Sequence, residues 1–161
     1  MLELKKRRAH FETQICVTGQ HREMLDQMLR VFGLRPDYDI GVMKARQGLA
    51  EVTTACLKGL DRVLRDERPG LVLVQGDTTT TLAASLAAYY YHIPVGHVEA
   101  GLCAEKKYDA FPEEVNRRVA THLSDSHFAP TEAARILLRE GISPENISVT
   151  GNTVIDALLI T

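Results

Sequence analysis

The sequence has no tryptophan, only three cysteines among 161 residues, and no long uninterrupted apolar run. A membrane-spanning helix needs about 20 mostly apolar residues, so none is expected, and the first residues lack the apolar segment of a signal peptide. The cysteines Cys16, Cys56 and Cys103 are far apart and lack the spacing of metal ligands. We therefore expect free thiols, a cytoplasmic location, and neither a membrane partner nor a bound metal.

An excess of charge of one sign is missing as well. The 19 basic and 21 acidic residues give a net charge of −2, which does not suggest a nucleic-acid partner. The phosphate-binding patterns G-x-x-x-x-G-K-[ST] and G-x-G-x-x-G are also absent, so no autonomous nucleotide-phosphate loop is visible. With 45% apolar residues, the chain can form one globular domain over residues 1–161.

Strand-like and helix-like segments alternate along the chain. After a helix-like start over residues 2–11, we predict strands over residues 14–18, 71–75, 94–98, 126–129 and 147–150. The helices are predicted over residues 21–32, 47–68, 78–91, 112–123, 131–140 and 153–160. The strand at 71–75 is an apolar run with two valines, and we expect it to be buried on both faces. This alternation predicts an α/β fold, in which helices flank a Rossmann-like parallel sheet.

Candidate site residues follow the predicted strands. Ligands of open α/β sheets bind beyond the carboxyl ends of the strands. The polar residues at these exits, together with a histidine inside the strand at 94–98, are Gln20, His21, Arg22, Gly76, Asp77, Thr78, His97 and Glu99. Two or three carboxylates with few cations suit proton transfer on a sugar or polyol better than phosphoryl transfer.

Each of these candidates also has a structural interpretation. Asp77 could cap the helix that follows, although hydroxyls lining a crevice would explain the four threonines after it better. Glu99 could form a buried salt bridge, and His97 could simply pack within its strand. Glu113 follows Pro112 at a predicted helix start, where acidic residues are common. The residues alone leave these alternatives open.

Four longer motifs carry a family resemblance. The stretches VTGQHREMLDQML, VQGDTTTTLAASLAAYYYHIPVGHVEAGL, FPEEVNRR and TGNTVIDALL resemble the non-hydrolysing UDP-N-acetylglucosamine 2-epimerases. The resemblance implies a GT-B arrangement of two Rossmann-like domains, in a family whose members are expected to be homodimers. It also implies interconversion of UDP-N-acetylglucosamine (UDP-GlcNAc) and UDP-N-acetylmannosamine (UDP-ManNAc) for surface polysaccharides, without a cofactor.

The resemblance assigns roles to individual residues. In the family, a base removes the proton at sugar C2 and UDP leaves, and reprotonation from the other face with return of UDP inverts C2. The acidic positions of the family fall on Asp77, Glu99 and Glu113, which we expect to be catalytic. Substrate contacts are expected from Gly76, Asp77, Thr78, His97, Glu99, Gln20, His21 and Arg22. Which carboxylate is the acid and which is the base stays open.

The chain also departs from the family pattern. An opening strand with a G-T-R-P-E loop is absent, and the second domain of the family would follow residues 151–161, the expected start of the connection. We therefore expect a truncated N-terminal domain that binds UDP-sugars weakly and is inactive alone. Alternatives are a non-catalytic subunit that binds an intact epimerase, and a relative of the hydrolysing epimerases that releases UDP.

Overall fold

A computed structural model of the protein describes residues 1–20, 22–44, 46–104 and 106–160. The chain divides into two compact units, residues 1–46 and residues 47–161, and each is described by itself. The prediction of a single domain over residues 1–161 stays a prediction.

The first unit holds two short parallel strands and two helices. Its elements are α1 (Leu2–Lys6), β1 (Cys16–Val17), α2 (Arg22–Val31) and β2 (Tyr38–Asp39). Cys16 lies opposite Tyr38 in the ladder, and the Asp37 carboxylate accepts the N–H of Ile15 at 2.7 Å. The helix predicted over residues 2–11 is shorter than expected and ends at Lys6.

The second unit contains a four-stranded parallel sheet. Its strands are β3 (Val72–Gln75), β4 (Val95–Val98), β5 (Ser126–Ala129) and β6 (Ile147–Val149), in that spatial order. Leu73 lies opposite Gly96, and Gly96 lies opposite Ser126. The connecting helices are α3 (Leu49–Glu67), α4 (Thr79–Tyr90), α5 (Glu113–Leu123), α6 (Ala133–Arg139), the 3-10 helix η1 (Pro144–Asn146) and α7 (Thr153–Ile160). The predicted fold class, a parallel sheet flanked by helices, is confirmed.

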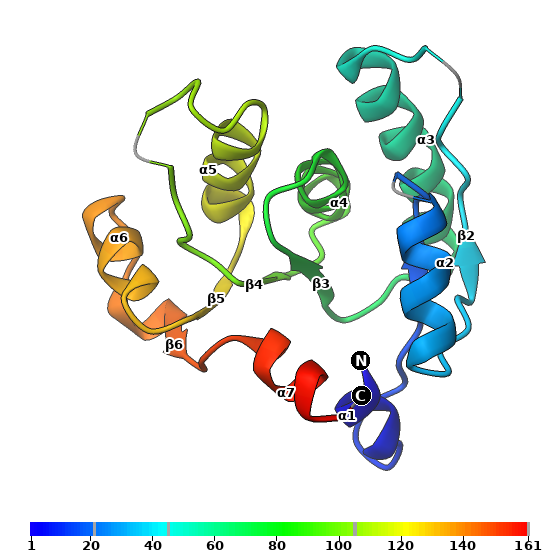
Figure 1. Ribbon diagram of the computed structural model, residues 1–161, viewed down its shortest axis with the longest axis horizontal. Coiled ribbons are helices and arrows are strands. Elements are labelled where there is room, and N and C mark those ends of the chain that lie inside the picture. The colour runs from blue at the N-terminus through cyan, green and yellow to red at the C-terminus, as the bar shows by residue number, and fades with distance from the viewer. Residues whose placement is uncertain (21, 45, 105, 161) are drawn as a thin grey trace. The chain divides into compact units, whose positions relative to one another are not determined.

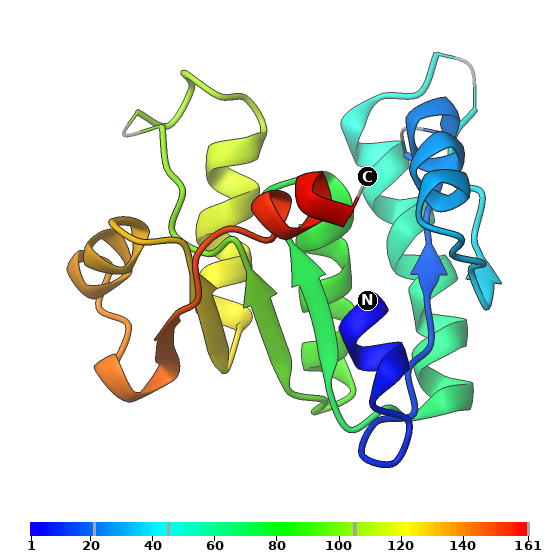
Figure 2. The ribbon, with the colours of Figure 1, turned by 60° about the horizontal axis from the view of Figure 1, so that its bottom comes forward.

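The core of the second unit lies on one side of this sheet. Helices α4 and α5 cover that side, and α4 packs between α3 and α5 (Figures 1 and 2). Small side chains allow this close packing: Ala83, Ala87 and Ala88 of α4 are buried. Helix α3 adds an apolar stripe at i, i+4 spacing, formed by Val52, Cys56, Leu60 and Leu64.

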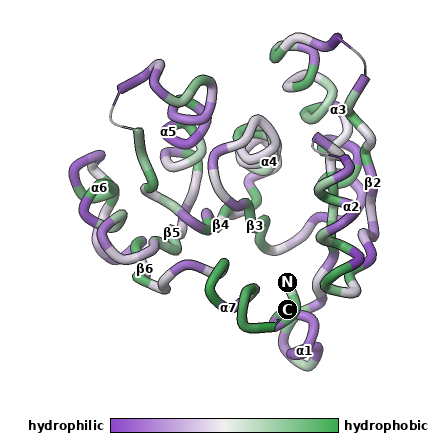
Figure 3. The backbone as a smooth tube through the Cα atoms, viewed as in Figure 1, coloured by the Kyte–Doolittle hydropathy of each residue, from purple (hydrophilic) through white to green (hydrophobic). Residues whose placement is uncertain are grey.

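The other side of the sheet is more open. The expectation that the strand at 71–75 is buried on both faces is wrong, because Leu71 and Leu73 are 47% and 41% exposed. Leu73 lies over Gly96, where a Cβ would approach Leu73 Cδ2 at 2.7 Å. Helix α7 lies on this side and is apolar along most of its length, and it has no buried residue (Figures 1 and 3).

Candidate active site

The turn from β3 into α4 presents Asp77 without using it as a helix cap. Gly76 adopts φ +73° and donates its N–H to Val98 O at 3.0 Å. The N-cap of α4 is Thr78, whose Oγ1 accepts the N–H of Thr81 at 3.3 Å. The interpretation of Asp77 as the cap is therefore wrong. Its half-buried carboxylate lies next to a cap that is already supplied.

The threonines after Asp77 have mainly structural partners. Thr81 Oγ1 donates to Gln75 O at 2.7 Å, and both Thr79 and Thr81 are 3% exposed. The expectation that the threonine hydroxyls line a ligand crevice is wrong for these two residues. Thr78, directly after Asp77, is half-buried, so its hydroxyl can still meet a ligand.

Glu99 follows β4 in a strained backbone conformation. Its φ of +62° lies in the left-handed region, which costs a residue with a Cβ roughly 1–2 kcal/mol. The strain turns its side chain toward the exit of β3: a Cβ built on Gly76 would lie 3.8 Å from Glu99 Oε2. The described residues give Glu99 no ion pair, so the salt-bridge interpretation finds no support among them. Strain of this kind is concentrated at functional sites.

His97 lies beneath the same turn. The imidazole is fully buried, and its Nε2 is 2.7 Å from Gly76 O. Since a carbonyl only accepts, Nε2 carries the proton, and Nδ1 has no partner among the described residues. Burial lowers the pKa of His97, which keeps the ring neutral. His97 therefore supports the Gly76–Asp77 turn from below, and its expected substrate contact stays a prediction.

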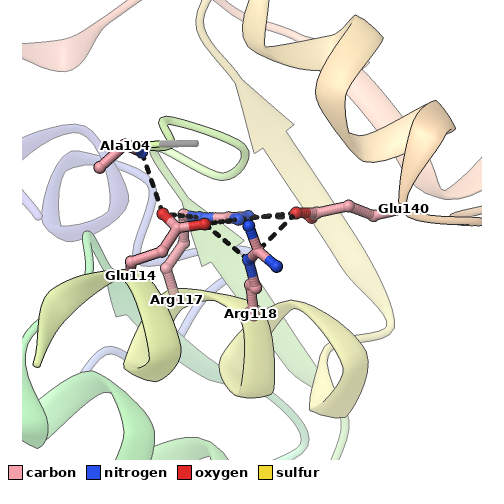
Figure 4. A network of polar contacts seen from close by, with 5 residues as sticks. All are labelled: Ala104, Glu114, Arg117, Arg118 and Glu140. Atoms are coloured by element: carbon pink, nitrogen blue, oxygen red, sulfur yellow. Dashed lines mark hydrogen bonds and ion pairs between the residues drawn. The ribbon is translucent and has the colours of Figure 1, made fainter. Parts of the chain in front are cut away.

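Glu113, the first residue of α5, is half-buried, and its neighbour Glu114 belongs to a buried polar network (Figure 4). Glu114 accepts the N–H of Ala104 at 3.0 Å and pairs with Arg117 at 2.9 Å. Arg117 in turn binds both carboxylate oxygens of Glu140, at 2.9 and 2.7 Å. Arg118 donates to Glu114 at 2.6 Å.

Hydrogen bonds within this network keep the Glu114 carboxylate and the Arg117 guanidinium ionised despite their burial. Burial alone would raise the pKa of Glu114, but the bonds from Arg117, the Ala104 N–H and Arg118 outweigh it and hold that pKa at about 2. Burial would lower the pKa of Arg117, but its bonds to Glu140 and Glu114 raise it. Arg117, Arg118 and Glu140 were not among the candidates predicted from the sequence. The i, i+3 spacing of Glu114 and Arg117 was a visible signal, whereas the third partner, Glu140, lies 23 residues further on.

The loop after Glu99 also depends on close packing by α6. Gly101 is buried at φ +85°, and a Cβ there would lie 2.5 Å from Ala133 O and 3.0 Å from Leu137 Cγ. Ala133 and Leu137 of α6 also form a small apolar core with Ala100 and Ala129. This packing fixes the chain two residues after Glu99.

The predicted substrate contacts of the first unit are described separately. Gln20 is half-buried, Arg22 is exposed at the start of α2, and His21 lies outside the described residues. The Arg22 guanidinium is bonded to Asp39 and Asp26, and these contacts raise its pKa. Two carboxylates therefore compete with any anion for this side chain.

The second unit thus brings Gly76 and Glu99 together at the carboxyl ends of two neighbouring strands, with Asp77 and Thr78 next to them. Within the described ranges, no three His, Cys, Asp or Glu side chains are grouped to hold a metal ion. In the same part of the chain, every helix is too short or too polar to cross a bilayer. The chemistry available at this edge of the sheet is that of carboxylates.

Comparison with known proteins agrees with this arrangement. The family model described as UDP-N-acetylglucosamine 2-epimerase matches residues 3–161. The chain belongs to this family. A UDP-N-acetylglucosamine 2-epimerase of Salmonella typhimurium (strain LT2) is 59% identical over 151 residues, which are 93% of this chain and 40% of that protein.

Solved epimerases share the fold of the chain. The UDP-GlcNAc 2-epimerase from Neisseria meningitidis, crystallised with UDP-GlcNAc, superposes with a TM-score of 0.94 at 53% identity. That match covers 99% of this chain and 43% of that one. The S. aureus MnaA–UDP co-structure gives a TM-score of 0.91 at 48% identity, covering 98% of this chain and 41% of that one. The family resemblance of the motifs is confirmed, and the chain spans about 40% of the length of the curated relatives it matches.

Proposed function

We propose that this chain supplies the proton-transfer carboxylates of a UDP-GlcNAc 2-epimerase that forms UDP-ManNAc. The observation that carries the proposal is a pair of half-buried carboxylates at neighbouring strand exits: Asp77, relieved of capping by Thr78, and Glu99, turned toward Gly76 by a strained backbone. Supporting evidence comes from relatives at 53–59% identity that are named for this reaction.

The reaction needs acid–base groups and no redox partner. A carboxylate removes the C2 proton of the sugar, a C1–C2 double bond forms, and the C1–O bond breaks with its electron pair going to UDP. A second group then protonates C2 from the opposite face, and the phosphate oxygen of UDP attacks C1. Asp77 and Glu99 take the proton-transfer and sugar-contact roles in this proposal, and Glu113 supports them.

The remaining candidates have assisting roles. Thr78 and Gly76 contact the sugar beside Asp77, while Gln20, His21 and Arg22 stay candidate substrate contacts. His97 acts through the Gly76 carbonyl, because it is fully buried. Active epimerase is expected to need the region of the relatives that this chain does not span, and to be a homodimer.

A chimera tests the proposal. The 161-residue chain replaces the matching 43% of the Neisseria meningitidis epimerase, and the products of UDP-GlcNAc are followed by NMR. We expect UDP-ManNAc, and a loss of at least roughly 100-fold in turnover for Asp77→Asn and Glu99→Gln. Glu132→Gln, on the exposed surface of α6, serves as the matched control and should keep full turnover.

Each other outcome of that experiment favours a stated alternative. Release of free UDP and N-acetylmannosamine would indicate a hydrolysing epimerase. A folded chimera that binds UDP but leaves UDP-GlcNAc unchanged would indicate a non-catalytic subunit. In that case, the isolated chain should instead co-purify with an intact epimerase.

A further inference from the structure

Three charged side chains join the segments that carry Glu99 and Glu113. We call Glu114, Arg117 and Glu140 the α5–α6 clamp. Glu114 and Arg117 lie on α5, and Glu140 is the C-cap of α6 (Figure 4). The side chains of Glu114 and Arg117 are each 1% exposed and that of Glu140 is 19% exposed, so the clamp is sheltered from water.

The clamp reaches two of the three catalytic candidates, Glu99 and Glu113, through the backbone. Glu114 follows Glu113 directly, so fixing its side chain fixes the first turn of α5. Its Oε2 also accepts the N–H of Ala104, five residues after Glu99. At the other end, Arg117 holds Glu140, while the start of the same α6 packs against Gly101, two residues after Glu99. The loop after Glu99 is therefore held at two points.

Stability alone gives little reason for such a cluster. Removing charges from water is costly, and replacing a buried ion network by apolar side chains is often neutral or stabilising. What the network adds is geometry, since the Arg117 guanidinium bonds bidentately with Glu140 and holds Glu114 as well. A displacement of about 1 Å at a reacting group can reduce turnover roughly 100-fold.

We propose that Glu114, Arg117 and Glu140 are positioning residues that set Glu113 relative to Glu99 in the epimerase site. This inference rests on the proposed function. The clamp acts by holding the backbone of the loop and of α5 and does not touch the substrate, so its loss should misplace one carboxylate relative to the other. The two half-reactions, removal of the C2 proton and its return from the other face, then lose their coordination.

Two variants disturb the clamp to different degrees. Arg117→Lys keeps the charge but removes the bidentate geometry, and Glu140→Gln is milder because that side chain is partly exposed. Glu132→Gln is the matched control, since Glu132, the exposed N-cap of α6, pairs with Arg135 at 3.0 Å.

The first measurement uses the 161-residue chain itself and needs no activity. Amide hydrogen exchange of Ala104 should accelerate roughly tenfold in Glu140→Gln and further in Arg117→Lys, because Glu114 loses its fixed orientation. The Val95 amide, which donates to Asp125 Oδ2 at 2.8 Å, is the internal reference for global opening. If the variants do not change the exchange rate of the Ala104 amide relative to that of the Val95 amide, the clamp does not hold the loop after Glu99.

The second measurement uses the chimera. In the clamp variants we expect turnover to fall roughly 10- to 100-fold with KM within about twofold of wild type. More UDP and more of the glycal, the sugar with the C1–C2 double bond, should be released for each UDP-ManNAc formed. A merely structural role would reduce the amount of folded enzyme and leave that ratio unchanged.

The outcomes separate the two proposals. An unsubstituted chimera without epimerase activity would contradict the proposed function, while Ala104 exchange would still decide whether the clamp fixes the loop. An active chimera whose clamp variants match Glu132→Gln in turnover and product ratio would refute the positioning role.

Discussion

At position 99, the backbone conformation and the proposed role of the side chain favour different residue types. Its φ of +62° favours glycine, yet the position holds a carboxylate beside Gly76. A residue kept in a strained conformation is expected where its side chain is needed for function. Glycine and alanine substitutions separate the two demands, because both remove the carboxylate and only glycine relieves the strain.

We expect Glu99→Gly to be more stable than Glu99→Ala by about 1 kcal/mol, since alanine keeps the left-handed strain. Urea unfolding of the 161-residue chain measures the difference. Both substitutions should abolish epimerisation in the chimera. Equal stability of the two variants would show that the backbone at Glu99 is not strained.

His97 predicts how stability depends on pH. Burial lowers the pKa of His97 in the folded state, whereas the unfolded chain titrates near the ordinary value of about 6.5. As the pH falls below about 6.5, the unfolded state binds the proton first, so the free energy of unfolding decreases by up to about 1.4 kcal/mol per pH unit. The contribution is constant above that range.

Urea midpoints at pH 7.5 and pH 5 provide the measurement, with His97→Gln as the comparison because glutamine keeps an N–H donor for Gly76 O. The pKa of Glu114 is lowered from 4.5 to about 2, so stability from that group is lost only below about pH 4.5. His97→Gln should therefore show a shallower decrease between pH 7.5 and 5. Identical slopes for both proteins would rule out His97 as the cause.

Among the elements, α6 packs so closely on the loop after Glu99 that residue 101 has no room for a side chain. Gly101 and Gly141 have nearly the same φ, +85° and +87°, but only Gly101 faces backbone, because a Cβ added there would lie 2.5 Å from Ala133 O. At Gly141, nothing lies within 4 Å of such a Cβ. The pair therefore separates close packing from backbone strain.

We expect Gly101→Ala to lower the free energy of unfolding by about 1–3 kcal/mol more than Gly141→Ala, because the added methyl group displaces α6. Thermal or urea unfolding of the two variants measures this difference. If both substitutions cost the same, α6 does not pack against Gly101 as described.

The positions of most helices and strands were predictable from the sequence, whereas the burial of their residues was not. Apolar periodicity and Pro–Gly breaks located α3, α4 and the strands β3 to β6 to within a few residues. The two-residue β2 carried no periodic signal, and the predicted helix over residues 2–11 was too long. Leu73 looked like a buried residue because composition cannot tell an edge strand from a central one.

In the candidate site, likewise, the sequence indicated the candidate residues but not the partners of their side chains. Asp77, Glu99 and Glu113 were identified from strand exits, a helix start and family motifs. That Thr78 rather than Asp77 caps α4, and that His97 is buried against Gly76 O, depend on side-chain orientation. The partnership of Arg117 with Glu140 depends on tertiary contact between two helices. Sequence spacing contains neither kind of information.

The chain as a whole spans about 40% of the length of the curated relatives it matches, so the complete epimerase activity is a proposal. In the proposed reaction, Asp77 and Glu99 exchange the C2 proton of the sugar with solvent-derived protons. The most direct test is incorporation of deuterium at C2 when the chimera acts on UDP-GlcNAc in D2O. We predict one deuterium at C2 of the UDP-ManNAc formed, and its loss in Asp77→Asn and Glu99→Gln. Product that forms without deuterium, or exchange that persists in both variants, would show that Asp77 and Glu99 do not transfer the C2 proton.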